Sequence, residues 1–346
     1  MSPYALSILL SSLSTGTIIT LISHHWFLAW VGLELNTLAM IPLMSKMHHP
    51  RATEAATKYF LTQAAASALL LFAVILNAWN TGEWTIIYMQ TTIPLLMITT
   101  ALMIKLAIAP FHLWLPDVIQ GLDLTTSLIL STWQKLAPMA LLIQMSAELN
   151  PALLIFLGAL SIALGGWGGL NQPQLRKIMA YSSTAHLGWM VVVLTYSKQL
   201  TLINLSVYLV MTSSMFLLML SLTSTNINKM ATSWMKSISL VSMMLIILMS
   251  LGGLPPTSGF IPKWLILEEM TKQNMAPLAT VMALSALLSL FFYLRLTYTV
   301  SLTTPPSPSN SKLTWRLKTT SNQATPAMTI ISTMLLPITP TIMSLF

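Results

Sequence analysis

The chain has 346 residues, of which 55% are hydrophobic and only 7% are charged, and its formal net charge is +8. Soluble domains carry a charge at about a quarter of their positions, so this composition excludes an ordinary soluble protein. The absence of cysteine excludes disulfides and thiolate metal sites. The basic balance does not indicate a nucleic-acid partner, because Lys and Arg accumulate in the loops that stay on one side of a membrane.

Apolar segments recur along nearly the whole chain, and each is long enough to cross about 30 Å of hydrocarbon. We therefore predict an all-α polytopic membrane protein with about eleven transmembrane helices. The first five are expected at 3–21, 25–44, 57–79, 86–109 with a broken continuation to 119, and 125–145. The other six are expected at 151–170, 177–197, 200–222, 238–267 with a break near 252–262, 277–300 and 325–345.

The fourth and ninth spans are alike, because each has an apolar run, a proline break and a lysine close to that break. They lie an odd number of helices apart, so two five-helix blocks have opposite orientations in the membrane. Inverted repeats with broken helices are typical of ion-coupled transporters. We therefore expect half-channel bundles at 1–147 and 148–300, an exposed loop at 301–324 and a C-terminal transmembrane helix at 325–346.

Basic residues concentrate in four of the five even-numbered connections between the predicted spans, and the exception is the connection that holds Asp117 and Asp123. Four such connections hold Lys46, Arg51 and Lys58, then Arg176 and Lys177, then Lys229 and Lys236, then Lys312, Arg316 and Lys318. The remaining connections are acidic or nearly neutral, with one exception at Lys198. The positive-inside rule therefore predicts that the N-terminus and the basic loops face the cytoplasm-equivalent side and the C-terminus the other.

Four ionisable residues lie within apolar segments, namely Glu34, Lys105, Lys135 and Lys263. A charge at membrane depth costs roughly 2.5–3.5 kcal/mol on insertion scales and usually marks an ion or proton path. Glu34 is the natural partner of Lys105, although the two could also form a static buried pair that only holds helices together. Such a pair often costs as much in desolvation as it returns in Coulomb energy, which favours the proton path.

Prolines accompany each of the three lysines. Pro110 lacks an N–H group and opens the helical ladder next to Lys105, and freed carbonyls with trapped water can solvate an ammonium and relay its proton. Pro138 removes the hydrogen bond of the Gln134 carbonyl beside Lys135, which we predict to be the central proton carrier. Lys263 follows a second segment that cannot stay helical, GGLPPTSGFIP at 252–262.

Two histidines near these segments have two interpretations that the sequence leaves open. His112 follows the break in the fourth span, and His186 lies in YSSTAHLGW. Both could relay protons, because histidine titrates near neutral pH, or both could be core residues that donate to a carbonyl. The sequence contains no P-loop, dinucleotide fingerprint or haem-type histidine pair, and GGWGGL at 165–170 indicates helix packing. We therefore expect no redox centre, metal or nucleotide site in this chain.

Several motifs closely resemble subunit 2 of vertebrate mitochondrial NADH:ubiquinone oxidoreductase, respiratory complex I. They are WVGLELNTLAMIPLM, TEAATKYFLTQA, PFHLWLPD at 110–117, WQKLAP at 133–138, GGWGGLNQPQLRKIMAYSSTAHLGWM at 165–190 and GGLPPTSGFIPKW at 252–264. The resemblance covers essentially the whole chain. Small departures, such as PPTSGF where PPLTGF is common, leave the motifs recognisable.

The resemblance implies an antiporter-like membrane-arm subunit of the inner mitochondrial membrane, with the basic loops in the matrix and the C-terminus in the intermembrane space. In the family, the matched positions Glu34, Lys105, Lys135 and Lys263 translocate protons, and Glu34 pairs with Lys105. NADH, FMN, iron–sulfur clusters and ubiquinone are bound by other subunits. The implied partners are other membrane-arm subunits and membrane lipids, cardiolipin among them.

Two other functions fit the same residues less well. A free-standing Na⁺/H⁺ antiporter uses the same fold without redox coupling, and a scaffold would use the buried charges only to hold neighbouring subunits. The family's animal form lacks three N-terminal helices of its bacterial relatives, which leaves a flank that a partner must cover and so favours a subunit. A scaffold would tolerate Lys135→Met, whereas a proton pump would not.

Overall fold

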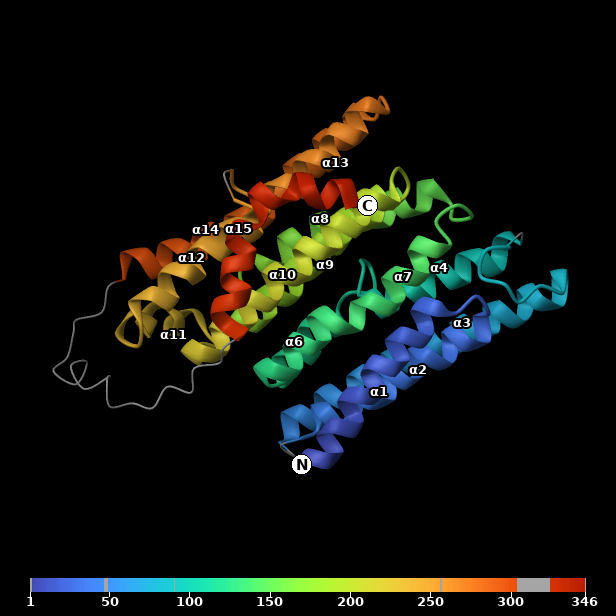
Figure 1. Cartoon of the computed structure of the whole chain (residues 1–346), viewed down its shortest axis with the longest axis horizontal. Helices are drawn as coiled ribbons and strands as arrows, with labels where there is room; N and C mark the ends of the chain where they lie inside the picture. Colours follow the sequence, from blue (N-terminus) through green and yellow to red (C-terminus); the bar gives the residue numbers. More distant parts are fainter. Residues whose placement is uncertain (1, 47–48, 90, 256, 304–323, 346) are drawn as a thin grey trace. The chain divides into compact units, whose positions relative to one another are not determined.

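The computed structural model describes residues 2–46, 49–89, 91–255, 257–303 and 324–345. In this described part the backbone is almost entirely helical, with no β-strand and only two isolated bridges, His25 with Thr85 and Gln174 with Asn226. The predicted all-α architecture is confirmed (Figure 1). Nearly all of the expected loop at 301–324, and one proline of the second predicted break, lie outside the described residues.

The chain forms two compact units, Met1–Leu160 and Ser161–Phe346. The first contains α1 (Pro3–Ile22), α2 (Trp26–Met44), α3 (Pro50–Thr81), α4 (Thr92–Leu106), α5 (Trp114–Gly121), α6 (Leu124–Thr132), the 3₁₀ helix η1 (Trp133–Lys135) and α7 (Leu136–Gln144). Helix α8 (Pro151–Gly169) continues from the first unit into the second. The predicted division into half-channel bundles at 147 and 148 stays a prediction.

The second unit continues with α9 (Leu175–Leu194), α10 (Lys198–Leu222), α11 (Ile227–Ala231), the 3₁₀ helix η2 (Thr232–Met235), α12 (Ile238–Gly252), α13 (Phe260–Lys272), α14 (Ala276–Leu302) and α15 (Ala324–Leu345). Helix α15 packs on α10 and α12, and the Ser258 hydroxyl donates to the Ser332 carbonyl over 2.7 Å. This bond ties the segment between α12 and α13 to the last helix.

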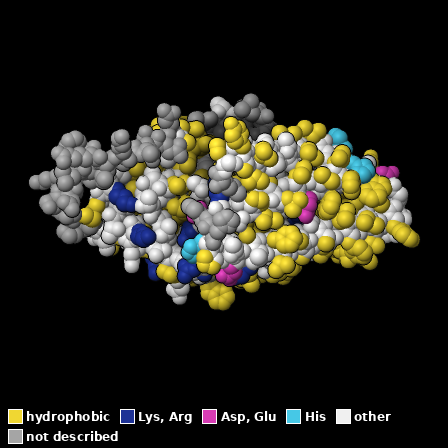
Figure 2. Space-filling model, turned by 90° about the horizontal axis from the view of Figure 1, so that it is seen from below, with side chains coloured by type: hydrophobic (Ala, Val, Ile, Leu, Met, Phe, Trp, Pro, Cys, Tyr) yellow, Lys and Arg dark blue, Asp and Glu magenta, His cyan; other side chains and the backbone are white. Residues whose placement is uncertain are grey.

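Within the described residues, six helices are long and apolar enough to cross a bilayer by themselves: α1, α2, α3, α8, α10 and α14. Each of the eleven predicted spans coincides with one helix or with a helix and its broken continuation. Large apolar side chains remain exposed, such as Tyr4 at 81% and Leu302 at 78%. Figure 2 shows hydrophobic side chains over much of one face, as expected for a surface that meets lipid.

Two helix starts differ from the prediction. Helix α3 begins at Pro50 and not at 57, because Pro suits the first helical turn and the His49 ring caps the Arg51 N–H at 3.2 Å. Helix α4 begins at Thr92 and not at 86, because Thr85 pairs with His25 in an isolated β-bridge and a bend follows at Ile86 and Ile87.

Helices α1 and α2 approach closely through two glycines. A Cβ atom on Gly16 would lie 2.9 Å from the Gly32 carbonyl oxygen, and one on Gly32 would lie 2.8 Å from the Gly16 carbonyl oxygen. Small residues at helix contacts let backbones pack tightly in membranes. Gly32 precedes Glu34 by two residues, so Glu34 lies beside this close contact. The glycines of GGWGGL pack in the same way, with Gly165 on Thr184 and Gly169 on Phe292.

Both predicted helix breaks are present, and each is bridged by a side chain from the far side. Helix α4 ends where Ala107 adopts a left-handed conformation with φ of 60°, before a cis Ala109–Pro110 bond. The indole Nε1 of Trp114 then donates to the Ile104 carbonyl over 3.0 Å. A break leaves the last helical carbonyls without their usual donors, so such a side chain satisfies one of them.

The fifth span, predicted as one helix over 125–145, is also interrupted. Its two α-helical parts, α6 and α7, are joined by the 3₁₀ turn η1. Pro138 explains the position of this turn, because it has no N–H group for the Gln134 carbonyl and weakens the helix one turn earlier. The interruption places Lys135 at a bend between two helices.

Candidate functional site

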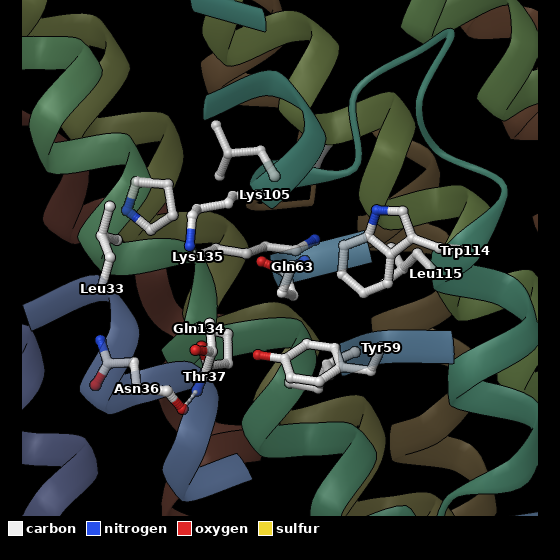
Figure 3. Close-up of a pocket in the computed structure, with 13 residues that line it drawn as sticks. Leu33, Asn36, Thr37, Tyr59, Gln63, Lys105, Trp114, Leu115, Gln134 and Lys135 are labelled. Carbon is white, nitrogen blue, oxygen red and sulfur yellow. Dashed lines mark hydrogen bonds between the residues drawn. The ribbon is translucent and has the colours of Figure 1, made fainter. Parts of the chain in front are cut away.

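Lys105 and Lys135 line one buried cavity in the first unit (Figure 3). Lys105 belongs to the last turn of α4 and Lys135 to η1, so both lie next to an interruption of a helix. Their exposed fractions are 6% and 4%. Residues from α2, α3, α5 and α7 complete the wall, and the cavity has about 20 Å³ of space for the centres of water molecules. That space is enough for about one water molecule.

Amide side chains face this cavity without protein partners. Both polar atoms of the Asn36 side chain, the Gln63 Nε2 and the Lys105 Nζ are buried and make no hydrogen bond with the protein. A buried polar atom without a partner costs about 1–3 kcal/mol, and such atoms are usually satisfied by internal water. Grouped around a cavity of molecular size, these four atoms indicate a hydrated polar chamber within an apolar bundle.

The bend at η1 is fixed to the neighbouring helix by one polar bond. The Gln134 Nε2 donates to the backbone carbonyl oxygen of Asn36 over 3.3 Å, which joins η1 to α2. Figure 3 shows the hydroxyl of Tyr59 pointing toward the side of the cavity where Gln134 and Thr37 lie. Because Lys135 follows Gln134 directly, this contact also positions the second lysine.

Glu34 follows the cavity-lining residue Leu33 on α2 and is half-buried, and its Oε2 atom is buried without a hydrogen-bond partner. It interacts electrostatically with both Lys105 and Tyr59. Within the described residues, however, no ion pair of 4 Å or less includes Glu34 or Lys105. The direct pairing that the resemblance implied is therefore not formed in this conformation, and the two groups interact across a gap.

A polar cleft of about 270 Å³ opens beside α3 and α5, two of the helices that also line the cavity of Lys105 and Lys135. Lys58 connects them there, at 2.8 Å from Glu54 on its own helix and 3.6 Å from Asp117 on α5. The Asp117 side chain is 51% exposed. The next residues inward are Tyr59 and Trp114, whose ring centroids are 5.9 Å apart.

Lys263 and His186 share a second small cavity, which lies in the second unit. The Nζ of Lys263 donates to the Gly252 carbonyl over 2.8 Å, and the His186 ring lies 5.7 Å from the Tyr208 ring. This cavity has about 10 Å³ of space for water centres, close to the minimum for one molecule. The structure thus brings together a lysine and a histidine that the sequence placed 77 positions apart.

His112 lies in the segment between α4 and α5 and is buried, with 7% exposed. It hydrogen-bonds the backbone of Pro110, whose carbonyl is the only polar backbone group. It is not part of the wall of the cavity that holds Lys105 and Lys135. The relay role of His112 stays a prediction.

Sequence reasoning missed Tyr59, Gln63 and Gln134 as members of the site. A signal for two of them was present, because Tyr59 and Gln63 are four residues apart and so lie on one face of the helix. Gln134 carried no separate signal. Among the described residues, no group of three or more His, Asp or Glu side chains has a metal-binding arrangement.

Two family models together match most of the chain. The model described as "NADH:quinone oxidoreductase/Mrp antiporter, TM" matches residues 23–289, and that described as "NADH dehydrogenase subunit 2 C-terminus" matches residues 290–343. A solved structure of respiratory complex I from Thermus thermophilus contains a chain with a TM-score of 0.87 and 25% identity, covering 99% of this chain and 80% of that one. An Mrp complex of Dietzia matches with a TM-score of 0.79 and 18% identity, covering 88% of this chain and 61% of its own, which shows a shared fold.

Relatives that match over their full length identify the family more specifically. The NADH-ubiquinone oxidoreductase chain 2 of Tetraodon nigroviridis is 58% identical over 347 residues, covering 100% of this chain and 99% of its own length. The protein of the same name from Xenopus laevis is 57% identical over 343 residues, covering 98% of this chain and 99% of its own. With matches of this length and identity, the chain belongs to the NADH-ubiquinone oxidoreductase chain 2 family, within the antiporter-like membrane proteins.

Proposed function

We propose that this chain translocates protons as a membrane-arm subunit of respiratory complex I, along a path that uses Glu34, Lys105, Lys135 and Lys263. The observation that carries the proposal is the shared cavity of Lys105 and Lys135, lined by amides without protein partners. Burying two ammonium groups in an apolar bundle costs free energy, and ionisable residues in such places usually mark an ion or proton path. NADH oxidation and ubiquinone reduction take place in other subunits, which bind NADH, FMN, the iron–sulfur clusters and ubiquinone.

The cavity supports a simple exchange of charge. When one lysine holds a proton, its positive charge disfavours protonation of the other, because like charges at close range in a poorly polarisable interior repel strongly. A negative Glu34 favours the charged form of Lys105, and a change in its distance or protonation shifts the proton toward Lys135. Water between the amides of Asn36 and Gln63 provides the hydrogen-bonded link.

Proton uptake is proposed to begin at the polar cleft of Glu54, Lys58 and Asp117. The cleft and the cavity are consecutive along both α3 and α5, since Lys58 precedes Tyr59 and Asp117 follows Trp114 by one turn. We place the Tyr59–Trp114 ring pair between the two spaces, because both residues line the cavity and neighbour the cleft along the chain. A movement of these rings would admit water to Lys105.

Release is proposed to use Lys263, with His186 as a relay in the same cavity. The inner mitochondrial membrane is the proposed location, with the N-terminus and basic loops in the matrix and the C-terminus in the intermembrane space. The proposed partners are the other membrane-arm subunits and lipids such as cardiolipin. The basic even-numbered connections support this orientation.

Two other functions remain as alternatives that an experiment separates. The fold similarity to an Mrp complex is compatible with Na⁺/H⁺ exchange, but full-length identity above 50% to chain 2 relatives favours the subunit. A scaffold would explain buried charges without a cavity. The unsatisfied amide atoms around Lys105 argue against it, because a structural core benefits from satisfied polar groups.

A Lys105→Met substitution in the intact complex tests the proposal. We expect the variant to assemble and oxidise NADH with a lower proton-to-electron ratio, whereas Lys272→Met leaves that ratio unchanged. Lys272 is a suitable control because its side chain is 62% exposed and pairs only at the surface, with Glu268. An unchanged ratio in assembled Lys105→Met would favour the scaffold, and proton movement that requires Na⁺ and not K⁺ would favour the antiporter.

A further inference from the structure

Arg295 is an exposed cation on the outer face of α14, in the middle of an apolar strip. Phe291, Tyr298 and Leu302 lie on the same face and are 58%, 60% and 78% exposed. Within the described residues, no carboxylate lies within 4 Å of the guanidinium. An arginine on a membrane-facing strip therefore needs an anion from outside the described protein to balance its charge.

The guanidinium is held in place by the protein. Its Nη1 donates to the Leu170 carbonyl oxygen over 2.7 Å, just beyond the end of α8. Guanidinium has five donors in a planar fork, so most of them remain available after this bond. Such a fork matches the oxygen atoms of a phosphate and binds two of them at once. The bond to Leu170 orients the group as a preformed anion site.

Two grooves meet at Arg295 and Phe291. One has a volume of about 580 Å³ and runs along α14 past Tyr298 and Leu302, with walls that are almost wholly apolar. The other has about 540 Å³, includes Trp167 and Asn171, and has a mixed polar and apolar wall. An apolar channel beside an arginine, with a polar recess on the other side, matches an acyl chain attached to a phosphate headgroup.

The depth of Arg295 also fits a headgroup. It precedes the end of α14 at Leu302 by seven residues, or about 10 Å along a helix axis. The same end of the second unit is basic, because Arg176 and Lys177 follow the α8–α9 connection. Trp234 of η2 also lies at this end, where its indole donates to the Val300 carbonyl over 2.7 Å. Basic residues at a membrane surface attract anionic lipids, and exposed Trp and Tyr prefer the interface.

We propose that Arg295 and its two grooves bind an anionic glycerophospholipid from the leaflet at the basic end of the second unit. The phosphate accepts hydrogen bonds from the guanidinium, and one acyl chain follows Phe291, Tyr298 and Leu302. This site is separate from the proton path. It gives the chain a lipid-dependent anchor for α8 and α14, since the arginine joins the two helices.

Lipid mass spectrometry of the intact complex, after extensive washing in mild detergent, tests the site. We expect Arg295→Gln to lose one anionic phospholipid per complex, while Arg295→Lys keeps part of the binding and Lys272→Gln loses none. Proton pumping by Arg295→Gln in vesicles rich in phosphatidylglycerol is expected to match the parent complex. An unchanged count of anionic lipids in Arg295→Gln would overturn the proposal.

A second measurement uses the unmodified complex and so does not depend on the stability of a variant. Photoactivatable phosphatidylglycerol and phosphatidylcholine, each in the same nanodisc, are compared for crosslinks to residues 291–302. Stronger crosslinking by phosphatidylglycerol supports the site. Equal crosslinking by the two lipids, or crosslinks between this strip and a neighbouring subunit with no lipid attached, would contradict it.

Discussion

The Nζ atom of Lys263 lies 2.8 Å from the carbonyl oxygen of Gly252, so the first turn of α13 donates to the last turn of α12. The other broken helix has the same arrangement, where Trp114 of α5 donates to the Ile104 carbonyl of α4. The C-terminal carbonyls of a helix carry partial negative charge, which an ammonium at this position stabilises. Lys263 therefore both closes a helix break and lines a cavity.

Gly253→Ala should displace Lys263 from its carbonyl. Gly253 has a left-handed φ of 78°, and an added Cβ would lie 2.8 Å from the Lys263 Nζ. The matched control is Gly82→Ala, because Gly82 has a φ of 76° and nothing within 4 Å of its added Cβ. Each variant should lose about 1–2 kcal/mol of stability from backbone strain. Only Gly253→Ala should also lower proton pumping per NADH, and equal pumping by the two variants would show that the Lys263 position is unimportant.

Trp114→Phe should loosen the break between α4 and α5 while keeping most of its packing on Tyr59. The change removes the indole donor to the Ile104 carbonyl, which is worth about 1 kcal/mol for a typical hydrogen bond. Thermal unfolding of the purified complex, followed by the loss of this subunit, measures the effect. Trp79→Phe is the control, because Trp79 is 86% exposed. A Trp114→Phe complex as stable as the control would show that the bond adds nothing.

Gly16→Ala should prevent the close approach of α1 and α2. The new methyl group would overlap the Asn36 Oδ1 and lie 2.9 Å from the Gly32 carbonyl oxygen, and the latter is backbone that cannot rotate away. Overpacking of this kind costs about 1–3 kcal/mol and would also move Asn36 at the cavity. We expect less assembled complex on a native gel. Gly252→Ala, whose added Cβ meets only Tyr293 at 3.7 Å, should assemble normally, and equal yields would contradict the packing argument.

Tyr59→Phe should slow proton uptake without affecting assembly. The ring contact with Trp114 is kept, and only the hydroxyl that points into the cavity is removed. We expect a lower pumping rate and a larger solvent hydrogen–deuterium isotope effect on it than in the control Tyr4→Phe, which alters a tyrosine that is 81% exposed. Identical rates and isotope effects in the two variants would remove Tyr59 from the path.

The helices could be predicted from sequence because apolar length has a direct physical meaning in a bilayer. The breaks at Pro110 and at 252–262 followed from proline and glycine chemistry. The interruption at η1 was not predicted, since Pro138 is compatible with a kinked continuous helix as well as with a 3₁₀ turn. The first two turns of α3, about seven residues, were missed because the charges of Arg51, Glu54 and Lys58 are typical of a loop.

The site was only partly predictable. The lysines could be found in the sequence because charge is rare in this chain. Tyr59, Gln63 and Gln134 are residue types that occur throughout proteins, and only the structure shows that they line one cavity. The shared cavity of His186 and Lys263 depends on the packing of α9 against α13, which no local pattern specifies. The direct pairing of Glu34 with Lys105 stays a prediction, because charge alone does not fix the separation of two side chains.

The most direct test of the account is the number of protons pumped per NADH oxidised by an assembled complex with Lys135→Met. Met is close to Lys in length and apolar, so it suits the buried position of a side chain that is 4% exposed and removes only the charge. The account predicts normal assembly and a reduced proton-to-electron ratio. A normal ratio in the assembled variant would contradict the central role of Lys135.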